Sequence, residues 1–265
     1  MNSLLADPRR AKGAPNIFKN FFKGWNAFEY IMFFIGLTVP LTLGIVFRSH
    51  PLFIVAGTCF SLTSLFLAKG KIEGYFMALV SAALYAAVAW MLKLYGEVAI
   101  QFFIMYPMAI AGIISWAKNR RVSRTDGVVV VVGHVGLIEL FCLVFVAAGM
   151  AAPLYFLLRI LKTDYLILSV ASLCLTIIFG YLLIRRSRKA MWFNVLSDIP
   201  TLVIWILMVV GGVQSAIPLL AMETIFIVQD IFGIFEWREL KRRQRKSKRQ
   251  HKTNDIDNGK DDVIL

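Results

Sequence analysis

Apolar residues form eight long runs along the chain, and the short segments between them carry most of the charges. A run of about 20 apolar residues can cross a hydrocarbon layer of about 30 Å as a helix. The pattern therefore predicts eight membrane-spanning helices. Their predicted limits are 29–47, 51–68, 74–92, 98–117, 135–158, 165–184, 192–212 and 217–236.

Composition agrees with this pattern. The 265 residues are 58% hydrophobic and 17% charged, whereas a soluble domain is about half apolar and about a quarter charged. These values exclude an ordinary soluble protein and indicate an all-α integral membrane protein that crosses the bilayer several times.

The distribution of basic residues predicts the orientation. If the loops alternate from an inside start, 25 of the 29 Lys and Arg residues lie on one side. Basic residues favour the cytoplasmic side of short loops, so we expect a plasma or inner membrane protein with both termini cytoplasmic. The net charge of +13 then follows from topology, and we expect no nucleic-acid partner.

The two ends of the chain are polar. Residues 1–28 form the predicted cytoplasmic N-terminal segment, and residues 238–265 form a basic and then acidic tail that we expect to be disordered. Nine of the fifteen residues from Arg238 to Lys252 are basic. Such a run anchors the topology and can also attract anionic membrane lipids.

One short motif occurs twice. Gly112-x-x-x-Trp116 and Gly233-x-x-x-Trp237 each end an apolar run and are followed by basic residues. Segments 71–116 and 192–237 are both 46 residues long, and each contains two predicted spans. The spans before them carry small or polar residues at matching offsets of 4, 7 and 11. The chain therefore predicts two three-helix repeats, 51–117 and 165–237.

The two repeats have the same predicted orientation, so an odd number of crossings must join them. The span 135–158 supplies this linker, and the span 29–47 is an extra N-terminal helix. The predicted architecture is thus one extra helix followed by a 3+1+3 arrangement of parallel repeats. Parallel repeats occur in transporters that bind substrate near the middle of the membrane.

Polar and aromatic groups inside the predicted spans are the candidate substrate-binding residues, because such groups are costly in a bilayer unless they have a partner, a cavity or a ligand. On the seventh span, four of them share one helical face, and the other spans of the two repeats add eight more. The candidates are Asn194, Asp198, Thr201, Trp205, Glu223, Gln229, Asp230, Trp237, Tyr85, Gln101, Tyr106 and Trp116.

Each candidate also has a structural interpretation. Trp116 and Trp237 lie at predicted interfaces, where indoles form an aromatic belt regardless of function. Asp198 and Asp230 could instead make structural hydrogen bonds. The small residues of the second and sixth spans, such as Ser61 and Ser64, are typical of close helix packing.

These motifs resemble the PnuC family of vitamin transporters over roughly residues 25–237. The resemblance includes Lys71-x-x-Gly74, Tyr95-Gly96-Glu97, both Gly-x-x-x-Trp endings and Trp192-x-Asn194-x-x-x-Asp198. It implies a fold similar to the SWEET sugar carriers. It also implies uptake of nicotinamide riboside by facilitated diffusion, with phosphorylation by a cytoplasmic kinase trapping the substrate for NAD biosynthesis.

The substrate and the functional class have alternatives. Tyr106 is an aromatic residue and Asp230 an acid, where such transporters often carry amides. Thiamine, riboflavin, a deoxynucleoside or a sugar therefore remain alternative substrates. The second class is a non-transporting membrane receptor or assembly partner. Homo-oligomer formation stays open.

Sequence motifs give no support for an enzyme. The chain has no G-x-x-x-x-G-K-[ST] phosphate loop, no H-E-x-x-H motif and no Cys-x-x-Cys pair. We therefore expect no catalytic residues, no metal ligands and no cofactor.

Overall fold

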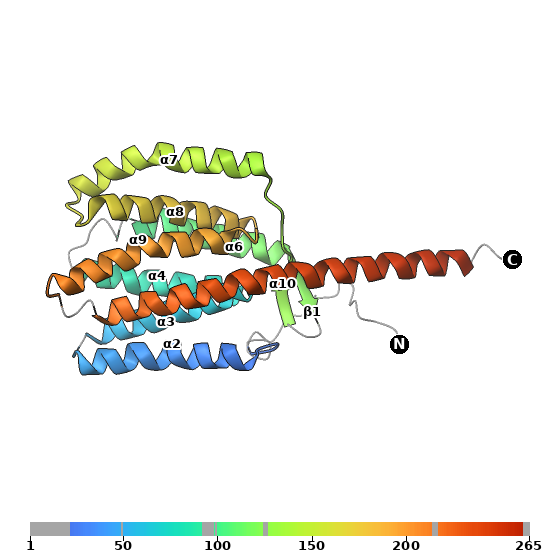
Figure 1. Cartoon of the computed structure of the whole chain (residues 1–265), viewed down its shortest axis with the longest axis horizontal. Coiled ribbons are helices and arrows are strands. Elements are labelled where there is room, and N and C mark those ends of the chain that lie inside the picture. The colour runs from blue at the N-terminus through green and yellow to red at the C-terminus, as the bar shows by residue number, and fades with distance from the viewer. Residues whose placement is uncertain are drawn as a thin grey trace.

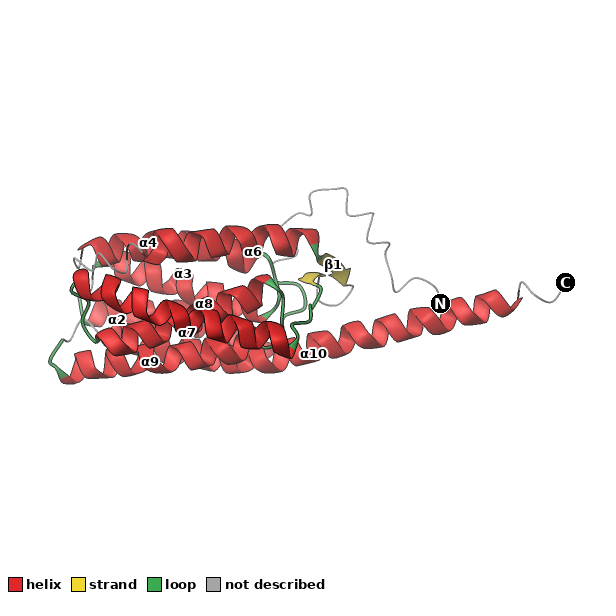
Figure 2. Ribbon diagram, turned by 90° about the horizontal axis from the view of Figure 1, so that it is seen from above, coloured by secondary structure: helices red, strands yellow, loops and turns green. Residues whose placement is uncertain are grey.

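The computed structural model describes residues 22–48, 50–91, 98, 100–123, 127–213 and 217–261. Its helices lie side by side in one bundle, and the last helix projects far beyond one end (Figures 1 and 2). The helices are α2 (Ala27–Val46), α3 (Pro51–Ala68), α4 (Glu73–Met91), the π-helix η1 (Gln101–Met105), α6 (Tyr106–Lys118), α7 (Leu137–Ile160), α8 (Leu166–Ile184), α9 (Ala190–Val210) and α10 (Ile217–Asp261).

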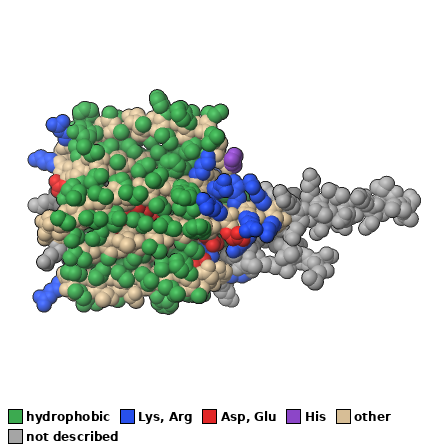
Figure 3. Space-filling view, in the orientation of Figure 1, with side chains coloured by type: hydrophobic (Ala, Val, Ile, Leu, Met, Phe, Trp, Pro, Cys, Tyr) green, Lys and Arg blue, Asp and Glu red, His purple; other side chains and the backbone are tan. Residues whose placement is uncertain are grey.

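The outer surface of the bundle is apolar. Within the described residues, seven helices are long and apolar enough to cross a membrane. Large side chains such as Ile138 and Phe141 on α7 are exposed, and hydrophobic side chains cover the visible face of the bundle (Figure 3). This surface fits a hydrocarbon environment, so the predicted helical membrane protein is confirmed at this level.

The fourth predicted span, 98–117, is not one regular α-helix. η1 and α6 occupy it, and they follow each other directly from Gln101 to Lys118. Pro107 lies in the first turn of α6 and has no N–H to donate to the preceding turn, which gives a physical reason for the wider π-helical turn there. The motif Tyr95-Gly96-Glu97 lies outside the described residues.

A small β-hairpin follows α6, although the sequence predicted only a loop. Strands β1 (Arg120–Ser123) and β2 (Gly127–Val130) pair antiparallel, with Arg120 opposite Val130. The Val130 N–H also donates to the Gly70 carbonyl in the turn between α3 and α4. The hairpin therefore joins the end of α6 to the end of α3.

The predicted disorder after Arg238 is wrong for the first part of the tail. α10 continues without a break through this segment, and its side chains hold the hairpin. Gln244 donates to the Val130 carbonyl and accepts from the Val132 N–H, both at 2.9 Å. These bonds favour helix over disorder because they give the extended helix a partner.

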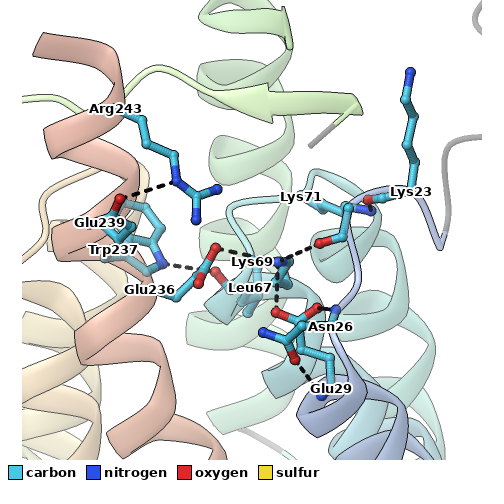
Figure 4. A network of polar contacts seen from close by, with 11 residues as sticks. Lys23, Asn26, Glu29, Leu67, Lys69, Lys71, Glu236, Trp237, Glu239 and Arg243 are labelled. Carbon is cyan, nitrogen blue, oxygen red and sulfur yellow. Dashed lines mark hydrogen bonds and ion pairs between the residues drawn. The ribbon is translucent and has the colours of Figure 1, made fainter. Parts of the chain in front are cut away.

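Buried ion pairs fix α2 to the rest of the bundle (Figure 4). Lys69 Nζ lies 2.7 Å from Glu29 Oε1 and 3.3 Å from Glu236 Oε1. It also donates to the Gly24 carbonyl. Glu29 and Asn26 form a reciprocal capping box at the start of α2. α2, the turn after α3, and α10 are therefore tied together at one point.

Candidate functional site: a polar cluster between α3, α9 and α10

Asp230 on α10 is the centre of a polar cluster inside the bundle. Its side chain is 2% exposed. Oδ1 accepts a 2.7 Å hydrogen bond from Ser64 Oγ on α3, and Oδ2 accepts one from Asn194 Nδ2 on α9. The carboxyl group of Asp198 on α9 lies next to it. Three helices thus meet at a single acid.

Helical spacing explains why these groups meet. Asn194 and Asp198 are four residues apart on α9 and therefore lie on the same face. Asp230 comes seven residues before Trp237 on α10, which corresponds to about 10 Å along the helix. The small side chain of Ser64 lets α3 approach closely enough for a hydrogen bond. The cluster therefore lies within the apolar part of the bundle.

The pair of acids has a definite protonation requirement. Two adjacent carboxyl groups can form a hydrogen bond only when one of them carries a proton. Asp230 already accepts from two donors, so the carboxylate is best placed on Asp230 and the proton on Asp198. The Asp198 Oδ2 atom is buried without a protein partner.

Two further polar residues extend the cluster along α10. Gln229 is fully buried, and its Nε2 donates to Ser61 Oγ on α3 at 3.0 Å, while its Oε1 has no protein partner. Glu223 is also buried. The charged groups that act on Asp198 are both acids, Asp230 and Glu223. The cluster therefore favours a ligand with positive charge and hydrogen-bonding groups.

A row of aromatic side chains ends on the face of α10 that carries two of these acids. The Tyr85 ring contacts the Phe60 ring edge-on, with ring centroids 5.6 Å apart. The centroids of the Phe60 and Phe226 rings are 6.1 Å apart. Phe226 shares a face of α10 with Glu223 and Asp230, three and four residues away. Sequence reasoning found Tyr85 but missed Phe60 and Phe226. The i+3 and i−4 spacing from the two acids was the signal that could have found Phe226.

Not every candidate belongs to the cluster. Thr201 Oγ1 lies 2.8 Å from Ser172 Oγ, so it links α9 to α8. Trp205 is half-buried further along α9. Gln101 is buried with an unpartnered Oε1, and Tyr106 stacks on Phe102. In the part of the chain that the structure describes, no hydrogen bond joins these four residues to Asp230.

The two motif tryptophans are fully buried, so the aromatic-belt interpretation is wrong for them. Trp116 Nε1 on α6 donates to the Leu183 carbonyl of α8 at 2.9 Å, and Trp237 Nε1 on α10 donates to the Leu67 carbonyl of α3 at 3.1 Å. Their rings lie 5.8 Å apart. The repeated motif thus makes the same contact twice, each time with the end of a different helix. In this conformation neither indole N–H is free for a ligand.

The described residues contain no group of three His, Cys, Asp or Glu side chains placed to hold a metal ion.

Comparison with known proteins identifies the family. Residues 50–239 match the family described as nicotinamide mononucleotide transporter, and this range contains every residue of the cluster. The chain belongs to this family. The family membership confirms the resemblance to PnuC transporters and establishes a multi-pass membrane protein of a transporter family.

Two individual relatives are consistent with this family. A nicotinamide riboside transporter PnuC from Neisseria mucosa is 27% identical over 231 residues, which cover 85% of this chain and 86% of the relative. The transporter of the same name from Haemophilus influenzae is 25% identical over 114 residues, 43% of this chain and 50% of that one.

A solved structure shares the fold. The crystal structure of the vitamin B3 transporter PnuC superposes with a TM-score of 0.77. The match covers 87% of this chain and 99% of the other, at 23% sequence identity. The arrangement of helices around the cluster is therefore the fold of this transporter family.

Proposed function

We propose that this protein transports nicotinamide riboside or a closely related vitamin or nucleoside across the membrane, and that the substrate binds at the polar cluster around Asp230. One observation carries the proposal. A buried acid joins α3, α9 and α10 inside the region that matches the transporter family, and unpartnered oxygen atoms of Asp198 and Gln229 lie beside it.

The chemistry of nicotinamide riboside matches this cluster. Its pyridinium ring is cationic, and aromatic faces attract such a ring by about 2 kcal/mol or more when water is excluded. Tyr85, Phe60 and Phe226 supply an aromatic row. The ribose hydroxyls and the carboxamide N–H₂ group are donors, and the unpartnered oxygens of Asp198 and Gln229 are acceptors.

The repeat architecture is part of the proposal. α3, α4 and η1 with α6 would form the first repeat, α8, α9 and α10 the second, with α7 as linker and α2 as the extra helix. The reciprocal indole bonds support this arrangement, because the last helix of each proposed repeat reaches the first helix of the other.

The transport mechanism we propose is facilitated diffusion with both termini in the cytoplasm. Phosphorylation of the arriving substrate would keep its free internal concentration below the external one, and this difference is sufficient to drive net uptake. Pro107 and Pro200 interrupt different members of the two proposed repeats, so no matching pair of broken helices in the described part of the chain offers an ion site. A proton is the ion that Asp198 and Asp230 could bind.

Purified protein in sealed liposomes tests the proposal. Labelled nicotinamide riboside should reach equal concentrations inside and outside, and it should exchange with unlabelled substrate. A panel of thiamine, riboflavin, deoxynucleosides and sugars identifies the substrate by competition. Failure of every compound to enter would favour a receptor or assembly partner, and accumulation driven by a sodium, proton or voltage gradient would contradict facilitated diffusion.

A further inference from the structure

A cleft with basic walls lies where α10 leaves the bundle. Its volume is about 340 Å³, and all the residues that line it are cationic. They are Arg188, Arg238, Lys241, Arg242, Arg245 and Lys246. The cleft lies further along α10 than Asp230, and none of its lining residues belongs to the polar cluster.

The geometry of α10 directs five of these side chains to one face. Measured from Arg238, the others follow at 3, 4, 7 and 8 residues, the spacing of a single helical face. The opposite face is fixed to other elements. Leu240 is buried, Gln244 bonds to the hairpin, and Arg121 donates to Ser247 at 3.0 Å. The basic face is therefore held in a fixed direction and is not a freely rotating tail.

The second wall of the cleft comes from the start of α9. Arg188 lies in the turn before this helix, whose N-terminus carries a partial positive charge. The Arg238 guanidinium lies 5.4 Å from the centre of the Trp192 ring in the first turn of α9. Trp192 is half-exposed, and basic side chains gather at the border of the apolar surface (Figure 3). The cleft thus opens at the level expected for lipid headgroups.

Few acidic side chains lie near the basic residues of the cleft. Glu239 lies beside the basic face and pairs with Arg242 at 3.8 Å and with Arg243 at 3.4 Å. The other five cationic groups have no acid among the residues that line the cleft. Their mutual repulsion is relieved by a bound anion, and guanidinium groups bind phosphate through paired N–H donors.

We propose that this cleft binds a phosphate group, carried either by an anionic lipid or by a soluble phosphate ester. The bound phosphate bridges Arg188 at the start of α9 to Arg238 and Lys241 on α10. It thereby holds these two helices together at the end of the bundle where the hairpin lies.

Binding to the purified full-length protein in neutral detergent tests the proposal. Short-chain phosphatidylglycerol and inorganic pyrophosphate are titrated separately, with short-chain phosphatidylcholine as the uncharged reference. The site variant is Arg238→Gln/Lys241→Gln. The matched control is Lys118→Gln/Arg120→Gln, which removes two exposed cations near the hairpin that do not line the cleft.

We expect saturable binding of phosphatidylglycerol or pyrophosphate by the natural protein and by the control. The site variant should bind about 30-fold more weakly, since each basic residue at such a surface contributes about fivefold. The charge-preserving variant Arg238→Lys/Lys241→Arg should retain most of the affinity, which separates loss of charge from misfolding. Binding of phosphatidylglycerol alone identifies a lipid site, and binding of pyrophosphate identifies a soluble phosphate site.

Two results would overturn the proposal. One is the absence of saturable binding of either anion. The other is an equal loss of affinity in the site and control variants, because that would show only a diffuse attraction to basic residues.

Discussion

Asp198→Asn and Asp230→Asn alter the same pair of carboxyl groups, yet we expect them to have different effects. Asp230 accepts hydrogen bonds from Ser64 and Asn194, and a protonated Asp198 beside it can donate a third. In Asp198→Asn, the amide N–H₂ replaces the acid O–H as donor to Asp230. In Asp230→Asn, the same replacement places an amide N–H₂ group, which is itself a donor, where three other donors converge.

The structure gives the size of the difference. A hydrogen bond to a charged group contributes about 1.5–3 kcal/mol and a neutral one about 1 kcal/mol. Asp230→Asn makes the bonds from Ser64 and Asn194 neutral, and it turns an amide N–H₂ group toward these two donors. Together these effects should reduce the free energy of unfolding by about 2–4 kcal/mol. Asp198→Asn keeps its bond and should cost less than about 1 kcal/mol.

Ligand binding separates charge from hydrogen bonding. A cation about 5 Å from one carboxylate gains about 3 kcal/mol at an effective dielectric constant near 20. Either single variant keeps one acid of the pair, which can carry the negative charge once its partner is an amide. The affinity for nicotinamide riboside should therefore fall by less than about tenfold, the factor for 1.4 kcal/mol. The double variant keeps none and should lose about 100-fold, the factor for about 3 kcal/mol.

Thermal unfolding and calorimetric titration in detergent provide the measurements. The reduced, uncharged form of nicotinamide riboside is the matched ligand, and Cys174→Ser is the control variant. Equal destabilisation by the two single variants would refute the placement of the proton on Asp198. Equal loss of the charged and the uncharged ligand in the double variant would show that the acids do not serve the positive charge.

Three further predictions concern the framework of the bundle. Lys69→Met should destabilise the protein by about 3–5 kcal/mol in a thermal unfolding assay, because it leaves Glu29 buried without its cation. Arg185→Gln breaks an exposed pair with Glu139 and should cost less than about 1 kcal/mol. A similar loss in both variants would contradict the role of burial. Trp237→Phe removes the bond to Leu67 and should cost about 0.5–1.5 kcal/mol, whereas Trp192→Phe, whose ring is half-exposed, should leave the unfolding temperature unchanged. A reporter fused to the C-terminus should read cytoplasmic and one inserted at Lys162 external; the same signal from both would exclude an odd number of crossings between these points.

Helix positions were predictable because the membrane imposes a simple rule of length and polarity. Most predicted spans agree with observed helices within a few residues, since a buried helix must satisfy its own backbone hydrogen bonds. The rule fails where a local partner decides the structure. The π-helical turn before Pro107, the hairpin at Arg120 and the continuation of α10 past Arg238 depend on such partners, which a hydropathy pattern does not report.

The centre of the candidate site was also predictable, because acids inside apolar spans stand out. Asp198, Asp230 and Asn194 were named from spacing, and the structure brings them together. Ser64 was assigned only to packing, since small residues usually serve that purpose. The burial of Trp116 and Trp237 was not predictable, because an indole near a span end looks the same in sequence whether it faces lipid or a neighbouring helix.

The two halves of the carboxyl pair stand on helices with different mechanical properties. α10 has no proline after Pro218 in its described length. We therefore expect it to move as one rigid helix, together with Asp230, Trp237 and the basic face. α9 contains Pro200 two residues after Asp198, and a proline inside a helix removes a backbone hydrogen bond and permits bending. A bend at Pro200 would move Asp198 while Asp230 stays in place, so the distance between the two carboxyl groups would change with the angle between α9 and α10.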